Sequence, residues 1–443
     1  MGPYIRFALT ALFTGLTFTV SAFAFEVDHT GPIDPDVPVI EPWKVVTLDG
    51  AAGGLWVVLG DVDGDGEAEV VSAENHNEGD VHYTSAVAVQ ELDGTLLWRW
   101  GDTGIGRKEW HHDVACQIHD WDNDGAMEVI VAADQAVVVL DGKTGEEELR
   151  FPIDKEASDC LVFCDLRGLG YAGDVLVKDR YHRIWAYTNS GELLWTVKDP
   201  GGYRTAHQPR PMDVDNDGRT EIMAGYALLN SDGTERWVYK SEKIELGKGH
   251  LDCARIYKQG RTAAKTKIVV TCCGANGLAM LNGEGTVLWE LTGHHFESLQ
   301  VGALFPDEQG KQIFVDIDHE PQGKSPLWVV DGGGQPRGKL MTDYGRHHRL
   351  VDWTGNGVEE MVVAENLGIF NHKGERIGFF KLPVAPGNTV EYEKSALRGD
   401  FDGDGVVDIA IASPSHLFIF RNEAGKPGIP PVPLGTGLNW TLY

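Results

Sequence analysis

The chain has 443 residues and a formal net charge of −29, from 67 acidic and 38 basic side chains. This acidic balance excludes a general nucleic-acid-binding protein, because phosphate binding requires a basic surface. Hydrophobic residues make up 42% of the chain. Beyond the N-terminal segment no apolar run is long enough to span a bilayer, so we expect no membrane partner.

Residues 1–24 have the pattern of a secretory signal peptide. Arg6 precedes an apolar stretch from Phe7 to Val20, and small residues lie just before the expected cleavage point. This segment is too short and wrongly flanked for a membrane anchor. We therefore expect a secreted, extracellular protein in which residues 25–42 form a proline-rich leader and residues 43–443 form one domain.

Four acidic segments then repeat the same nine-residue pattern. Each has Asp at positions one, three and five, Gly at position six, and Asp or Glu at position nine. Alternating oxygen ligands on a tight loop suit calcium, and Gly permits the sharp turn. A short apolar run follows each loop where an EF-hand would have a helix, so we expect the loops inside β-hairpins. Acidic turns without metal are the alternative for any single copy. The predicted ligands are Asp61, Asp63, Asp65, Glu69, Asp120, Asp122, Asp124, Glu128, Asp213, Asp215, Asp217, Glu221, Asp400, Asp402, Asp404 and Asp408.

The repeat extends beyond these four loops. Weaker versions occur at 165–170 and 352–360, and the segments 251–256 and 299–305 keep the flanking pattern without the acidic residues. The copies recur every ~40 to 60 residues, an interval typical of propeller blades. Hairpin turns with Gly and strands ending in an aromatic residue complete each unit. The sequence predicts an all-β, single-domain β-propeller with eight blades, or seven if one weak segment is an insertion.

Two further features concern the closure of the ring and the thiols. Residues 42–48 precede the first blade without a loop of their own, so we expect them to supply the outermost strand of the last blade. Six cysteines are present. A disulfide between Cys253 and either Cys272 or Cys273 is one interpretation, and isolated buried thiols are the other.

Residues just before each calcium-type loop should face the central funnel, because the innermost strand of a blade begins near the axis. Half of the sixteen histidines fall in these windows. Any single one could be a structural hydrogen bonder, but their concentration on equivalent positions favours a site for carboxylate recognition and proton transfer. The candidates are His111, His112, His207, His250, His295 and His348.

A charged stretch, Val-Lys-Asp-Arg-Tyr-His-Arg at 177–183, stands out in the third blade. A strand interior would not carry so many charges, so we expect it to end at the funnel. Tyr181, beside three cations, is a candidate proton donor. An ordinary ion cluster at a strand edge is the alternative.

These motifs resemble those of the calcium-containing β-propeller polysaccharide lyases, which include rhamnogalacturonan, ulvan and rhamnose–glucuronate lyases. The resemblance rests on His-His-Asp-Val-Ala before a calcium loop, Val-Lys-Asp-Arg-Tyr, Gly-His-Leu-Asp at 249–252 and Gly-His-His at 293–295. It implies β-elimination at a uronic acid. A cation neutralises the C6 carboxylate, a base removes the C5 proton, and an acid protonates the departing O4.

By position, the resemblance implies that His112 is the base or its partner, Tyr181 the other member of the acid–base pair, and Arg204 the carboxylate clamp. Arg suits this last role because its planar fork binds a carboxylate with two hydrogen bonds. Neighbouring substrate binders would be Lys178, Arg180 and His207. Ulvan-type lyases have a second His where this chain has residues 131–134 without one, so His207 or His250 would replace it, or the catalytic set differs.

Three other functions compete with this one. A non-catalytic calcium-dependent adhesion or carbohydrate-binding propeller explains the loops equally well but leaves the ring of histidines unexplained. A quinoprotein dehydrogenase is suggested by the Gly–Trp hairpins and the adjacent Cys272 and Cys273, although calcium loops are foreign to that class. A glycoside hydrolase would need two carboxylates from Asp113, Asp159 and Asp252. We expect a monomeric lyase acting on an acidic polysaccharide or oligosaccharide.

Overall fold

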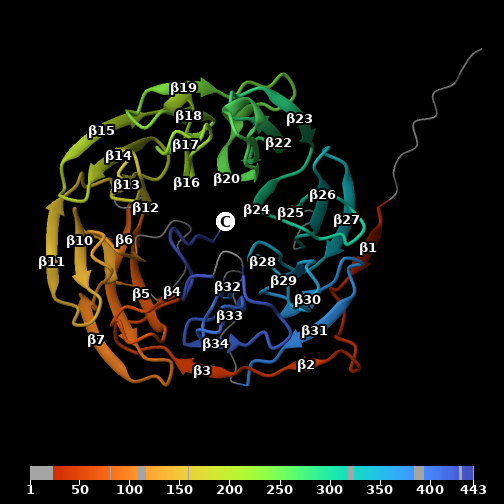
Figure 1. Cartoon of the computed structure of the whole chain (residues 1–443), viewed down its shortest axis with the longest axis horizontal. Helices are drawn as coiled ribbons and strands as arrows, with labels where there is room; N and C mark the ends of the chain where they lie inside the picture. Colours follow the sequence, from red (N-terminus) through yellow and green to blue (C-terminus); the bar gives the residue numbers. More distant parts are fainter. Residues whose placement is uncertain are drawn as a thin grey trace, which may run out of the picture.

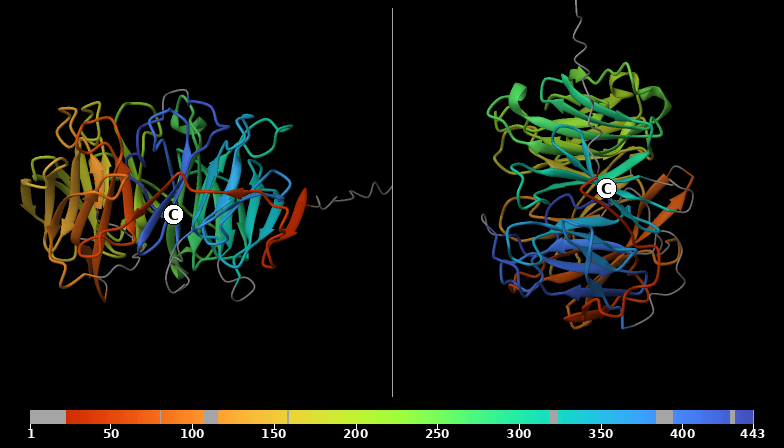
Figure 2. Two further views of the ribbon diagram at one scale, coloured as in Figure 1. Left: turned by 90° about the horizontal axis from the view of Figure 1, so that it is seen from below. Right: turned by 90° about the vertical axis from the view of Figure 1, so that its right-hand side faces the viewer.

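The computed structural model describes residues 23–79, 81–106, 116–157, 159–317, 324–383, 394–428 and 432–442. Over these residues the chain forms eight separate sheets arranged around a central axis (Figure 1). Side views show a flat ring of sheets that stand upright in it (Figure 2). The eight-bladed β-propeller predicted from the repeat is therefore confirmed.

Each blade contains four antiparallel strands that follow one another from the axis to the outside. Blades 1 to 4 contain β4 (Trp56–Gly60), β5 (Glu69–Glu78), β6 (Val81–Gln90), β7 (Leu96–Gly101); β8 (Cys116–His119), β9 (Glu128–Ala133), β10 (Ala136–Asp141), β11 (Glu147–Pro152); β12 (Leu161–Cys164), β13 (Asp174–Lys178), β14 (Arg183–Thr188), β15 (Leu193–Lys198); and β16 (Thr205–Met212), β17 (Glu221–Gly225), β18 (Ala227–Leu229), β19 (Glu235–Val238). Blades 5 to 8 contain β20 (His250–Lys258), β21 (Lys267–Cys273), β22 (Gly277–Asn282), β23 (Val287–Thr292); β24 (Phe296–Gly302), β25 (Gln312–Ile317), β26 (Leu327–Asp331), β27 (Pro336–Met341); β28 (His348–Val351), β29 (Glu360–Val363), β30 (Gly368–Phe370), β31 (Arg376–Phe380); and β32 (Ser395–Gly399), β33 (Asp408–Ala412), β34 (His416–Phe420), β3 (Lys44–Thr47).

Helical structure in the same residues is limited to the three short 3-10 turns η1 (Pro200–Gly202), η2 (Leu246–Lys248) and η3 (Ala263–Lys265). The described residues include no helix with the length and apolar character needed to cross a membrane.

The ring closes by pairing strands from the two ends of the chain. Strand β3 pairs antiparallel with β34, with Lys44 opposite Ile419 and Thr47 opposite His416. This confirms the role predicted for residues 42–48. Blade 8 is therefore built from strands near both ends of the chain.

The N-terminal leader adds two strands that the repeat did not predict. Strand β1 (Phe25–Asp28) pairs parallel with β27, and β2 (Val39–Ile40) pairs parallel with β31. Blades 6 and 7 thereby gain a fifth, outermost strand. The leader thus covers the free edges of two blades, which would otherwise expose unpaired backbone groups.

Neighbouring blades are held together by aromatic side chains of the outer strands. The indole N–H of Trp195 on β15 donates to the carbonyl of Ser231, in the hairpin turn of the next blade, over 3.0 Å. In that turn Gly233 has a φ of 82°, and a Cβ there would lie 2.7 Å from the Trp195 ring. Gly is required twice, for the left-handed backbone and for the close approach of the ring. The same bond joins Trp98 to Gly142, Trp237 to Gly283 and Trp289 to Gly332.

The C-terminal segment, residues 432–442, runs into the centre of the ring (Figure 1). The side-chain amide of Asn439 exchanges two 2.7 Å hydrogen bonds with the backbone of Phe163 on β12. The ring of Trp440 lies 4.5 Å from that of Trp56 on β4, and Arg349 on β28 donates to the Thr441 carbonyl. These contacts tie together the innermost strands of blades 1, 3 and 7.

All six cysteines lie in described residues, and none forms a disulfide. The pairing of Cys253 with Cys272 or Cys273 is therefore wrong, and the alternative of unpaired thiols holds. Instead, the thiol of Cys253 faces the carbonyl of Leu299 at 3.8 Å, and its backbone N–H donates to the Thr271 hydroxyl. Burial raises the pKa of the Cys272 thiol above its usual value, so it behaves as a small apolar side chain.

Candidate active site

The two faces of the ring carry different connections. Because the strands of a blade alternate in direction, calcium-type loops such as the one from β4 to β5 lie on one face. The turn from β13 to β14 and the starts of β16 and β20 lie on the opposite face, near the axis. Residues from blades 3, 4 and 5 can therefore meet there, although they are distant in sequence.

Tyr181, in the turn after β13, is the centre of this meeting point. Its ring centroid lies 4.8 Å from that of His250 and 5.4 Å from that of His207. The guanidinium carbons of Arg180 and Arg204 lie 5.1 and 5.5 Å from the same ring. The structure therefore brings together five of the residues singled out from the sequence. Two cations beside the phenol stabilise negative charge that develops on its oxygen.

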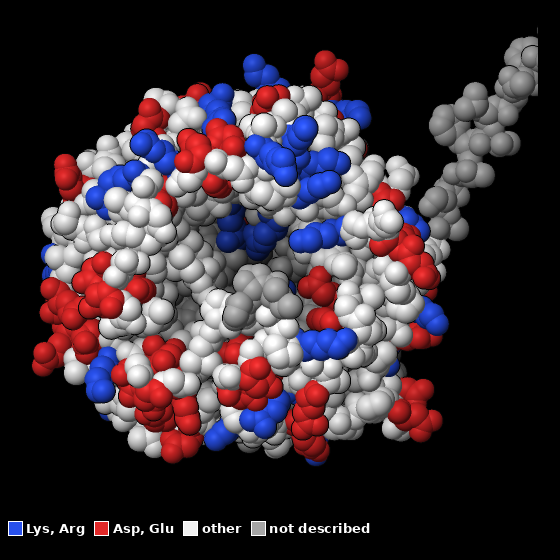
Figure 3. All heavy atoms as spheres, in the orientation of Figure 1, with Lys and Arg blue, Asp and Glu red and all other residues white. Residues whose placement is uncertain are grey.

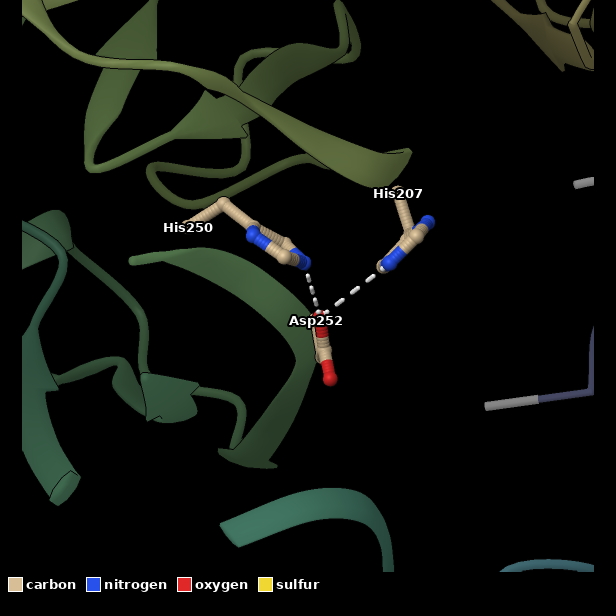
Figure 4. Close-up of side chains that lie close together, drawn as sticks. All are labelled: His207, His250 and Asp252. Carbon is tan, nitrogen blue, oxygen red and sulfur yellow. Dashed lines mark ion pairs between the residues drawn. The ribbon is translucent and has the colours of Figure 1, made fainter. Parts of the chain in front are cut away.

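His207 and His250 share a buried carboxylate (Figure 4). Asp252, 1% exposed, lies 2.9 Å from Nε2 of His250 and 3.6 Å from Nε2 of His207. Burial, reinforced by the positive neighbours Lys178 and Arg180, holds the pKa of His207 well below its ordinary value despite Asp252. Burial opposes ionisation of Asp252, but its hydrogen bond with His250 holds its pKa below the usual range. A neutral imidazole beside Tyr181 can accept a proton.

A buried ion pair supports the Tyr181 turn from below. Nζ of Lys178, which is 0% exposed, donates to Oδ2 of Asp159 over 2.8 Å and to the carbonyl of Arg180 over 2.7 Å. Lys178 thus has a positioning role in this structure, since a fully buried ammonium does not meet solvent. Asp159 is engaged as well and is not a free carboxylate of the kind a hydrolase requires.

His82, on β6 of blade 1, is a member of the site that the sequence interpretation missed. Its Nε2 lies 3.1 Å from Nη1 of Arg180 and 3.9 Å from Oδ1 of Asp159. Because a guanidinium only donates, this Nε2 must accept, which places the ring proton on Nδ1. The signal available in the sequence was the unusual length of the hairpin, since β5 and β6 have ten residues each and reach past their own blade.

A second cluster continues around the funnel from blade 5 to blade 7. The thiol of Cys273, whose residue is opposite His250 in the strand register, lies 2.9 Å from Nε2 of His295. Glu297 lies 3.2 Å from the same nitrogen and forms an ion pair with Arg346. Ligand atoms of Cys273, His295 and Glu297 lie within 4.8 Å of one another, as do those of His207, His250 and Asp252. Either trio could hold a transition metal by the chemistry of its donors.

The remaining predicted histidines are not all brought to this site. His348 is 0% exposed, and its ring nitrogens face the carbonyls of Gly345 and Phe314 at 2.7 and 3.3 Å. It is a structural hydrogen bonder here, without access to a substrate. His111 and His112 lie outside the described residues.

The four acidic loops share one hydrogen-bonded turn. In each, the carboxylate at position one accepts the backbone N–H of the Gly at position six, over 2.8 to 3.2 Å. Carboxylate oxygens of Asp61, Asp63 and Glu69 lie within 4.8 Å of one another. The Oε1 atom of Glu69 is buried and has no hydrogen-bond partner. A buried carboxylate oxygen facing other carboxylates fits a bound divalent cation, which would satisfy it.

Charge is distributed unevenly over the face seen in Figure 3. A group of Lys and Arg side chains lies inside the central hollow, whereas Asp and Glu are interspersed with further Lys and Arg on the rim. A locally basic funnel on a protein of net charge −29 is compatible with an acidic ligand at the axis.

Known proteins similar to this chain carry the same architecture. No family model matches it. The chain is 25% identical over 437 residues to the rhamnogalacturonan exolyase YesX of Bacillus subtilis, an alignment that covers 84% of this chain and 64% of that protein. It is 24% identical to the rhamnogalacturonan endolyase YesW of the same organism, covering 88% of this chain and 72% of that protein.

Among solved structures, the rhamnogalacturonan lyase PL11 of Bacillus licheniformis superposes with a TM-score of 0.62 at 17% identity, covering 86% of this chain and 75% of that one. Of the curated relative YesX, by contrast, the chain spans 64% of the length, which is less than two thirds. In sequence and fold it is similar to rhamnogalacturonan lyases, which confirms the resemblance to β-propeller polysaccharide lyases.

Proposed function

We propose that this protein is a secreted polysaccharide lyase that cleaves a uronic-acid-containing polysaccharide by β-elimination. The observation that carries the proposal is the convergence of Tyr181, Arg204, Arg180, His207 and His250 on one point of the funnel. Rhamnogalacturonan is the first substrate to test, because both curated relatives are named for it.

In this mechanism Arg204, which is exposed to the funnel, binds the C6 carboxylate of the uronate and makes the C5 proton more acidic. A base removes that proton, the C4–O4 bond breaks, and a C4–C5 double bond forms. Tyr181 and a histidine form the acid–base pair, so that one takes the C5 proton and the other protonates O4. His112 is the histidine implied by the resemblance, and His207, with a neutral ring, lies beside Tyr181 together with His250.

The four acidic loops would hold calcium through their carboxylates and stiffen the face opposite the funnel. Calcium supplies positive charge that offsets the clustered carboxylates. The loops lie at the other ends of the innermost strands, so we assign a structural role to calcium that they would hold.

The deciding experiment incubates the protein with rhamnogalacturonan, pectin, plant gum and ulvan, and follows ultraviolet absorbance and reducing ends together. An unsaturated uronate forms only by elimination, so a lyase raises both signals. A hydrolase raises reducing ends alone, and a carbohydrate-binding propeller raises neither. Either of these last two results on every polymer would overturn the proposal.

A further inference from the structure

The position-nine carboxylate of each acidic loop has a second oxygen whose surroundings differ between the blades. In blade 1 the position-nine carboxylate, Glu69, accepts the N–H of Val62 through Oε2 over 2.7 Å, which leaves Oε1 buried and without a partner. In blade 4 Glu221 accepts the N–H of Val214 in the same way, over 3.0 Å. The backbone frame of the loop is therefore conserved between these blades, and the second oxygen faces the same place.

What meets that second oxygen differs between the blades. In blade 4, Nη1 of Arg236, on the outermost strand β19, lies 2.9 Å from Oε1 of Glu221. Nη2 of the same guanidinium lies 2.5 Å from Oδ2 of Asp215, the position-three carboxylate. Arg236 therefore joins two of the predicted calcium ligands at once.

In blade 3 the arginine belongs to the loop itself. There position three is Arg167 in place of Asp, and its Nε donates over 2.7 Å to Asp174, whose other oxygen accepts the N–H of Leu166. The guanidinium thus pairs with the position-nine carboxylate, and the loop keeps the hydrogen bond from its position-six Gly170 to Asp165. In blade 7 the Thr354 hydroxyl donates to the corresponding oxygen of Glu360 over 3.0 Å.

We propose that Arg236 is a built-in counter-cation that competes with calcium for the blade 4 loop. This loop then binds calcium more weakly than the loops of blades 1 and 2, where no basic side chain of the described residues pairs with the acidic ligands, and it remains ordered without the metal. Blade 3, with Arg167 in the ligand set, binds none. The proposal rests on the proposed calcium binding but is independent of the lyase activity.

The competition has a simple electrostatic origin. Asp215 and Glu221 must give up the guanidinium, or share it, before they can bind a divalent ion. An ion pair of this kind, with Glu221 4% exposed and Arg236 25% exposed, holds the carboxylates in the calcium-free state. Removing the guanidinium raises the free energy of that state alone, so calcium affinity increases.

The test is a calorimetric calcium titration of the full chain after chelator treatment, comparing wild type, Arg236→Gln and Arg219→Gln. Arg219 is a matched control, because it lies in the same loop, is exposed and carries the same charge. The blade 8 loop belongs to the same weak class, because Arg421 pairs with its position-three carboxylate, Asp402. We expect Arg236→Gln to tighten one of these two weak binding events by ~5-fold, the equivalent of one ion pair. Arg219→Gln should leave the calcium affinity of that event unchanged. Adding Asp217→Asn to Arg236→Gln should abolish the tightened event, which assigns it to blade 4.

Thermal unfolding provides the second readout. In chelator, Arg236→Gln should unfold at a lower temperature than wild type, because Asp215 and Glu221 lose their counter-charge. In excess calcium the difference should vanish or reverse. An unchanged calcium affinity, or the same loss of melting temperature with and without calcium, would overturn the proposal and leave the lyase assignment untouched.

Discussion

The Nζ atom of Lys178 lies 2.8 Å from Oδ2 of Asp159, and both side chains are almost completely buried beneath the turn that carries Tyr181. The same ammonium also donates to the carbonyl of Arg180 over 2.7 Å. The pair therefore links a strand of blade 3 to the turn whose side chains form the candidate active site.

Replacing Lys178 by Met should both destabilise the protein and impair the site. The change leaves Asp159 buried without its ammonium partner, which costs about 3–5 kcal/mol of unfolding free energy. The Arg180 carbonyl also loses a donor, so the Tyr181 turn should shift. Urea unfolding measures the first effect and lyase turnover the second. The double variant with Asp159→Leu should recover stability without recovering turnover, and recovery of both would show that the pair does not position the turn.

Substitution of Tyr181 by Phe should separate chemistry from folding. The ring contacts with His207 and His250 are retained and only the hydroxyl is lost. If the hydroxyl transfers a proton, turnover should fall by about 100-fold or more while the melting temperature is unchanged. Substrate binding to the inactive protein, measured by calorimetry, should persist. Full turnover in Tyr181→Phe would remove the hydroxyl from the mechanism.

Arg204→Gln should change KM as well as kcat, unlike Tyr181→Phe, which should lower turnover alone. Loss of the guanidinium removes the group proposed to neutralise the uronate carboxylate, both in the bound substrate and as the C5 carbanion develops. We therefore expect a higher KM and a lower kcat together, and a larger loss on a uronate substrate than on its methyl ester. Equal losses on the acid and the ester would contradict the role of a carboxylate clamp.

Most features predicted from the sequence depend on patterns that recur in each blade. Acidic loops, glycine turns and apolar runs are local patterns, and they predicted the blade number, the closure by residues 42–48 and the convergence of Tyr181 and His207 on the funnel. The histidine of β6 could not be predicted from the residues before each loop, because His82 reaches the site from the far end of a long hairpin of another blade.

Features that depend on tertiary contact alone could not be predicted in this way. Strand β1 pairs with β27, more than three hundred residues away, and its four residues carry no distinctive pattern. The burial that makes His348 structural likewise comes from Phe314 and Gly345 on neighbouring segments. The misplaced disulfide has the same cause, because Cys253 turns toward Leu299 of the next blade.

His348 should contribute to acid sensitivity. Burial outweighs its two carbonyl contacts and lowers its pKa from 6.5 to about 3. The unfolded chain therefore binds a proton below pH 6.5 that the folded protein does not, so this contribution to stability is present above pH 6.5 and is lost as the pH falls toward 3. The slope reaches about 1.4 kcal/mol per pH unit. In His348→Gln, the dependence of unfolding free energy on pH in calcium should be shallower by that amount between pH 4 and 6, and an unchanged slope would contradict it.

The aromatic contact between blades predicts different outcomes for two similar glycines. Gly233 and Gly94 both occupy hairpin turns with positive φ, of 82° and 89°. A Cβ at Gly233 would lie 2.7 Å from the Trp195 ring, whereas nothing lies within 4 Å of one at Gly94. Both alanine variants bear the cost of a left-handed residue, about 1–2 kcal/mol. Gly233→Ala should lose a further 1–3 kcal/mol, roughly the cost of overpacking, in chemical unfolding. Because the Trp195 ring causes this additional loss of unfolding free energy, Trp195→Leu should remove most of it from Gly233→Ala. Equal losses at the two glycines would show that the adjacent blades can move apart to accommodate the added methyl group.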